Sequence, residues 1–75
     1  MISVYPNPTL DELHIDGITT STNYRLLNVT GRCVQTAYLQ KGKNTISLSG
    51  FIPGVYTLEI TGQDGIKTRT KVLKE

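Results

Sequence analysis

Tryptophan is absent from this 75-residue chain, and cysteine and histidine occur once each, as Cys33 and His14. A single cysteine forms no intrachain disulfide and offers no second thiolate for a tetrahedral metal site. The two residues are separated by an expected strand and two turns, so they form no visible catalytic dyad. We therefore expect a protein that is not an enzyme and that uses no cofactor.

Long apolar runs and phosphate-binding loops are also missing. Hydrophobic residues make up 37% of the chain, but no run approaches the roughly 18 residues that cross a bilayer. Neither a G-x-G-x-x-G nor a Walker pattern occurs. No basic and then apolar leader follows Met1, which leaves a cytosolic protein or a piece of a larger secreted one. We expect the secreted origin and no membrane insertion.

The positive charge is concentrated at the C-terminal end of the chain. The net charge is +2, and residues 66–75 carry Lys67, Arg69, Lys71 and Lys74 against Glu75 alone. Clustered cations can bind phosphates, but single-stranded nucleic acids also need aromatic side chains, and none occurs in this segment. A solvated strand face, or an edge strand that lysines protect from aggregation, is the better interpretation. We expect no nucleic-acid partner.

The apolar residues alternate with polar ones, and no window has the apolar stripe of a helix. Glycines fall at turn spacing, and Gly31, Gly42 and the Asp64–Gly65 pair suit tight hairpins. Strands that alternate with such turns are typical of antiparallel sheets. The pattern predicts seven strands, over residues 2–5, 12–16, 24–29, 33–39, 45–49, 55–61 and 66–73.

Alternation also assigns the strand faces. Tyr56, Leu58 and Ile60 point to one side of their strand, and Glu59 points to the solvated side. Seven short strands with turns every 8 to 12 residues favour an all-β fold, a seven-stranded antiparallel β-sandwich of immunoglobulin-like architecture. The cysteine and tryptophan framework of antibody domains is missing, so only the architecture is predicted. We expect one domain over residues 1–75.

Two short patterns have a functional and a structural interpretation. His14 lies between Glu12 and Asp16 on the outward face of a strand, where the three side chains either bind a metal weakly or form a solvated face. Asn28 begins N-V-T, which is either a glycosylation acceptor or the approach to a turn at Gly31. We prefer the structural interpretation of both and expect no metal.

The order of motifs resembles a known family. "VYPNPT" is followed by "LHID", "YRLLNVTGRCV", "NTISLSGFIPGVYTLEIT" and finally "DGIKTRTKVLKE". This series resembles the C-terminal sorting domain of proteins secreted by the type IX system of Bacteroidota, over essentially the whole chain. Each motif is weak by itself, but the complete series in this order and spacing is fairly specific. Cys33 departs from the pattern, because an aliphatic residue is expected there.

The resemblance implies which residues carry the sorting function. These are an opening motif, a glycine in a turn, a G-x-Y motif and a terminal basic strand: Tyr5, Pro6, Asn7 and Pro8; Gly31; Gly54 and Tyr56; and Lys71, Val72, Leu73, Lys74 and Glu75. We expect the Pro-Asn-Pro segment to fix where an upstream linker leaves the domain. We expect the terminal strand to contact a receptor, by adding to the edge of another sheet.

The resemblance also implies a route and partners. Proteins of this family reach the periplasm of a Gram-negative bacterium and cross the outer membrane through the type IX translocon. A sortase-like peptidase then usually removes the domain, and many cargoes are attached to lipopolysaccharide at the cell surface. The implied partners are the translocon, the peptidase and an upstream cargo domain. The alternative is an immunoglobulin-like adhesive or carbohydrate-binding module, although four of the five aromatic residues lie within expected strands.

Overall fold

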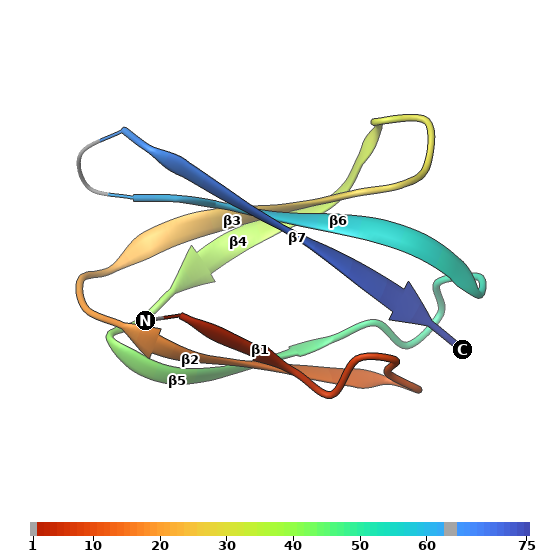
Figure 1. The fold of residues 1–75 in the computed structure, drawn as a ribbon, viewed down its shortest axis with the longest axis horizontal. Helices are drawn as coiled ribbons and strands as arrows, with labels where there is room; N and C mark the ends of the chain where they lie inside the picture. The colour runs from red at the N-terminus through yellow and green to blue at the C-terminus, as the bar shows by residue number, and fades with distance from the viewer. Residues whose placement is uncertain (1, 63–64) are drawn as a thin grey trace.

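Seven β-strands make up the regular structure of the computed structural model, which describes residues 2–62 and 65–75 (Figure 1). No helix occurs among these residues, and so none that could span a membrane. The strands are β1 (Ser3–Tyr5), β2 (Glu12–Ile18), β3 (Thr22–Leu27), β4 (Cys33–Leu39), β5 (Gly42–Ser47), β6 (Gly54–Thr61) and β7 (Lys67–Lys74).

The strands form two antiparallel sheets that pack face to face. The three-stranded sheet has the order β1-β2-β5, and the four-stranded sheet has the order β4-β3-β6-β7. Figure 1 shows the smaller sheet below the larger one, with the chain crossing between them after β2, β4 and β5. This arrangement confirms the immunoglobulin-like β-sandwich. Strand β7 is an edge strand of the larger sheet.

The core lies between the sheets and is filled by alternate residues of their strands. Leu13 and Ile15 of β2 face Leu26 of β3 and Leu58 of β6, and all four side chains are fully buried. Twelve buried side chains form one cluster, with Ile2, Val4, Val34 and Phe51 packed at its margin. Burial of apolar surface is the main stabilising term for a domain of this size. Cys33 lies outside this cluster and is half-buried.

Two of the three predicted glycine hairpins are present. Gly31 closes the β3–β4 turn with φ +87°, and Gly65 lies in the β6–β7 connection with φ +85°, a conformation that favours glycine. Asp64 lies outside the described residues. Gly42 has φ +98° but forms no hairpin, because β4 and β5 belong to different sheets. The Asn44 side chain stabilises that crossing, because it accepts a hydrogen bond from the Gln40 N–H and donates one to the Gln40 carbonyl.

Candidate recognition site

The segment between β1 and β2, residues 6–11, is called the strap here because it lies along the end of β7. The peptide bonds before Pro6 and Pro8 are both cis. The strap leaves β1 at one end of the domain, whereas β1 begins at the other end (Figure 1). The expectation that the Pro-Asn-Pro segment fixes the exit of an upstream linker is therefore wrong. The segment contacts the C-terminal strand instead.

Asn7 joins the strap to β7 through both atoms of its side-chain amide. Its Nδ2 donates a hydrogen bond to the Lys71 carbonyl at 2.9 Å, and its Oδ1 accepts one from the Leu73 N–H at 3.0 Å. A carboxamide carries the same donor and acceptor as a peptide group. The Asn7 side chain thus takes the place of a neighbouring strand at this position.

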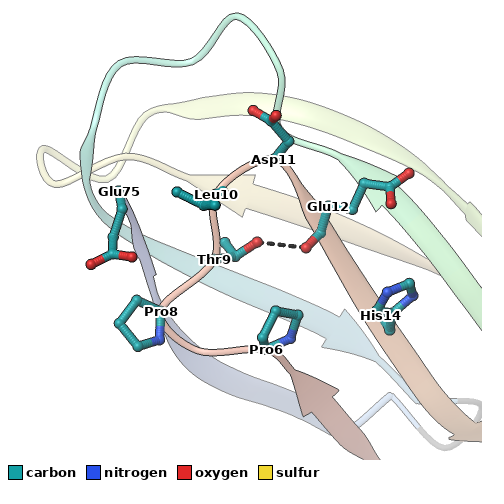
Figure 2. A pocket seen from close by; sticks show the side chains of 8 residues that line it. All are labelled: Pro6, Pro8, Thr9, Leu10, Asp11, Glu12, His14 and Glu75. Atoms are coloured by element: carbon teal, nitrogen blue, oxygen red, sulfur yellow. Dashed lines mark hydrogen bonds between the residues drawn. The ribbon is translucent and has the colours of Figure 1, made fainter.

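Thr9 continues the same contact with its backbone. Its N–H donates to the Leu73 carbonyl at 2.9 Å, and its carbonyl accepts from the Glu75 N–H at 2.8 Å, so that Thr9 and Lys74 form a parallel bridge. Its side chain is buried, and its hydroxyl donates to the Glu12 carbonyl where β2 begins (Figure 2). The strap therefore closes the outer edge of β7 from the Lys71 carbonyl to Glu75.

The G-x-Y motif lies on the other side of the same part of β7. Gly54 is opposite Lys74, and Tyr56 is opposite Val72. The Tyr56 ring is buried against Phe51 at a centroid distance of 5.9 Å, and its hydroxyl donates to the Ile52 carbonyl at 2.6 Å. Such a partner is what a buried tyrosine hydroxyl requires. Three of the four predicted motifs thus meet at one end of the sandwich.

Glycine is required at position 54 for its backbone angle. Gly54 has φ +156°, which residues with a side chain rarely adopt, although the space that a Cβ atom would occupy is open. The same holds for Gly31 at φ +87°, in a turn that the Asn28 side chain braces. Asn28 Oδ1 accepts from the N–H groups of Thr30 and Arg32 and from the Thr30 hydroxyl. This favours the turn interpretation of N-V-T. Gly31 is not part of the contact between strap and β7.

An open depression of about 460 Å³ lies between the strap, β2 and the C-terminal residue. Figure 2 shows its lining, which combines two prolines and a leucine with carboxylates: Pro6, Pro8, Thr9, Leu10, Asp11, Glu12, His14 and Glu75. His14 is engaged from two sides, because its Nδ1 lies 3.0 Å from the Thr45 hydroxyl and its ring packs, tilted by 36°, against the Tyr5 ring at a centroid distance of 5.4 Å. Among the described residues, no group of three or more His, Cys, Asp or Glu side chains is placed to hold a metal ion.

A buried carboxylate lies on the outer face of the larger sheet. Glu59 is only 2% exposed, although alternation placed it on the solvated side. The face was predicted correctly but the exposure was not, because three long cationic side chains cover the carboxylate. Arg69 Nε lies 3.0 Å from Oε2, and Arg25 Nη1 and Lys67 Nζ lie 3.4 and 3.9 Å from Oε1.

These cations stabilise the ionised form of Glu59. The hydrogen bond from Arg69, with the charges of Lys67, Arg69 and Arg25, holds the pKa of the carboxyl below its ordinary value, against an opposing effect of desolvation. On the inner side, burial raises the pKa of the Tyr24 phenol, whose hydroxyl donates to Gln35 Oε1 at 2.8 Å. Nothing in the sequence alone marked Glu59 as the centre of a cation cluster, because its partners come from β3 and β7.

Burial divides the residues of the terminal strand. Val72 is fully buried and Lys74 is 8% exposed, whereas Lys71 and Leu73 point outward. Lys74 Nζ donates to the Glu75 carbonyl at 3.1 Å. Lys74 therefore does not belong to the exposed basic face, which Lys67, Arg69 and Lys71 form. Thr9 was missed as a site residue, because only its register against Lys74 reveals its role.

The aromatic residues do not form a flat sugar-binding platform in the described part of the chain. Tyr24 and Tyr56 are buried, Phe51 is half-buried and Tyr5 packs against His14. Tyr38 is the exception, 85% exposed on β4. A carbohydrate-binding surface would need several such rings side by side. The geometry therefore gives the carbohydrate-binding alternative no support.

Comparison with known proteins supplies the family. No curated protein matches the chain. A family model described as a secretion system C-terminal sorting domain matches residues 3–75, nearly the whole chain. The match covers the strap, the G-x-Y motif and the terminal strand in one alignment. This chain therefore belongs to the family of C-terminal sorting domains, the sorting signals of type IX secretion.

Proposed function

We propose that this domain directs an upstream cargo from the periplasm across the outer membrane, through the type IX translocon, as a folded and non-enzymatic signal. After transport, a sortase-like peptidase removes the domain and the cargo is attached to the cell surface. The family match supports the sorting role in general. The individual partners and steps are our proposal.

The observation that carries this proposal is the contact between the strap and the terminal strand. Asn7 and Thr9 make four hydrogen bonds to residues 71, 73 and 75, which joins the two ends of the motif series into one surface. Such a surface exists only in the folded domain. A translocon that accepts only domains in which this contact has formed therefore distinguishes a complete C-terminal domain from an unfolded or truncated one.

The orientation of the chain suits a removable signal. Strand β1 begins at the end of the domain opposite the strap (Figure 1). A cargo linker joined to the start of β1 would therefore not cover the surface formed by the strap and the end of β7.

The proposal is tested by secretion of a reporter. The domain is placed behind a signal peptide, a fluorescent protein and a linker in a Bacteroidota host, and the reporter is measured in the periplasm, at the surface and in the medium. We expect surface or medium reporter for the intact domain and periplasmic reporter after deletion of residues 72–75. Because this deletion removes the buried Val72, it also disturbs the fold.

A milder variant tests the contact between strap and β7 without removing a core residue. Asn7→Ala removes two of the four contacts between strap and β7 while leaving the core intact, and Asn23→Ala, exposed on β3, is its matched control. We expect less surface reporter for Asn7→Ala than for Asn23→Ala. Periplasmic retention of the intact domain, in a host that secretes its own cargo, would contradict the sorting function and make ligand screening the next step.

A further inference from the structure

The first half of β7 has an outer edge that the strap does not reach. Backbone groups of successive strand residues point to opposite sides, and Leu73 points away from β6 toward the strap. By this alternation, Lys67, Arg69 and Lys71 direct their backbone groups to the same outer side. In the described part of the chain no strand pairs with β7 there, and the strap begins only at the Lys71 carbonyl. Residues 67–71, as far as the Lys71 N–H, are called the open edge.

The side chains beside the open edge give it a strong positive charge. Lys67 and Arg69 are 50% and 67% exposed, Lys71 is exposed, and Arg25 of the same sheet face is 45% exposed. Glu59, the one acidic residue on the outward positions of β3, β6 and β7, is buried beneath them. The face therefore presents four cations to solvent and only a shielded carboxylate.

An exposed strand edge and a basic face together select a particular kind of partner. An open edge pairs with an extended segment through main-chain hydrogen bonds, and specificity comes from the alternating side chains. Cations at the edge repel the same edge of a second copy, which prevents aggregation. The same cations attract glutamate or aspartate side chains that alternate along an incoming strand.

We propose that the open edge docks an extended acidic segment of a partner protein, which adds as a fifth strand to the larger sheet. This inference rests on the proposed function, since the partner would be a component of the secretion machinery. It redirects the expectation of strand addition from residues 71–75, whose edge the strap occupies, to residues 67–71. The strap sets where the added strand must end.

A binding experiment with the chain itself tests the docking site. The amide-labelled domain is titrated with a synthetic peptide in which glutamate alternates with valine, and with the same peptide carrying lysine in place of glutamate. We expect amide shifts at Lys67, Arg69 and Lys71, with slowed hydrogen exchange of the Arg69 and Lys71 N–H groups. Shifts confined to other residues, no shifts at millimolar peptide, or equal binding of the lysine peptide would each overturn the proposal.

Two variants separate charge from backbone pairing. The neutral-edge variant carries Lys67→Gln, Arg69→Gln and Lys71→Gln with Glu59→Gln, so that no buried carboxylate is left without its cations. We expect its affinity for the acidic peptide to fall about tenfold or more. Proline in place of glutamine at position 69 of this neutral-edge variant removes an outward N–H with no further change of charge and no loss of a bond to β6, and it should weaken binding further.

A control variant with the same change in net charge tests whether the position of the lost cations matters. The neutral-edge variant loses three cations and one anion, and Arg32→Gln with Lys41→Gln loses two cations at exposed turn positions, so both lower the net charge by two. The control should bind the acidic peptide within about twofold of the parent domain, because the affected charges lie away from the edge. If both variants lose the same affinity for the acidic peptide, the effect is one of net charge alone and the proposal is overturned.

The secretion assay distinguishes failure of this inference from failure of the proposed function. If the intact fusion is secreted and a folded neutral-edge variant is secreted equally well, the open edge is not the docking site and the sorting function stands. If the intact fusion itself is retained, the sorting function fails. If only the neutral-edge variant is retained, both proposals are supported.

Discussion

The two halves of β7 belong to one strand and pair with the same neighbour, β6, yet they have different environments. In the second half, Val72 and Lys74 are buried on the inner side, and the strap closes the outer edge. In the first half, the inward positions are threonines, of which Thr68 is exposed and Thr70 half-buried, and the edge is open. The second half holds the domain together, and the first half offers a surface.

This difference changes how a truncation is interpreted. Removing the last residues of the chain removes a buried valine and the partners of Asn7 and Thr9. Lost secretion after such a deletion reports a damaged fold at least as much as a lost contact. Residues whose side chains are exposed and whose edge is open are the better place to look for direct recognition.

The two halves of β7 should differ most in how much their inward side chains contribute to the free energy of unfolding. Val72→Ala should lower the free energy of unfolding by about 2 kcal/mol, because it removes two buried methyl groups and leaves a cavity. Thr70→Ala, two residues earlier on the same side, should change it by less than about 0.5 kcal/mol. Urea unfolding followed by far-ultraviolet circular dichroism measures both, since the chain has no tryptophan whose fluorescence could report unfolding. Similar losses in the two variants would mean that the inner side of β7 is uniform.

The hydrogen bonds between Asn7 and the edge of β7 should contribute less to the free energy of unfolding than Val72 does. Asn7→Ala should cost about 1 kcal/mol, because it removes two partly exposed hydrogen bonds, and Asn23→Ala should cost less. Amide exchange sharpens the comparison within β7. The Leu73 and Glu75 N–H groups should be protected in the parent domain, and Leu73 should lose protection in Asn7→Ala. The Arg69 N–H should exchange rapidly in both, and its protection would contradict an open edge.

The sequence predicted the fold well because each strand carries its own alternation and each sheet has one buried face. Leu58 and Ile60 were placed in the core and are fully or almost fully buried. The crossing at Gly42 was mistaken for a hairpin, since a glycine with positive φ suits both connections. Whether two successive strands pair or separate depends on which face each must bury, and a local turn pattern does not carry that information.

The candidate site was only partly predictable. The family resemblance selected Asn7 and the terminal residues, but which atoms meet depends on the path of the strap between them. Thr9 gives no signal of its own, because a threonine after Pro-Asn-Pro is equally compatible with a solvated turn. Glu59 was expected to be solvated because alternation predicts the sheet face to which a side chain points, but not whether neighbouring side chains cover it. Its cover comes from Arg25 and Arg69, on strands that are distant in sequence and adjacent in the sheet.

The smallest effect concerns the first half of β7 and depends on pH. Arg69 and its neighbours lower the folded-state pKa of Glu59, so the unfolded chain binds its proton more readily than the folded one. The resulting stabilisation is complete above the ordinary pKa of a glutamate and is lost as the pH falls through the lowered, folded-state value. Since the three cations are half-exposed, solvent and salt weaken the effect.

Glu59→Gln isolates this contribution from the other titrating groups. The variant should be less stable than the parent domain at neutral pH, because three cations lose their anion. The difference should shrink as the pH falls through the lowered, folded-state pKa of the Glu59 carboxyl, because the protonated carboxyl of the parent resembles the amide. Urea midpoints across this pH range measure it, with Glu12→Gln as the control, an exposed carboxylate without an ion pair among the described residues. If the urea midpoints of the parent and of Glu59→Gln change in parallel with pH, Glu59 does not interact measurably with the cations beside the open edge. Those cations would then be equally available to a partner with or without Glu59.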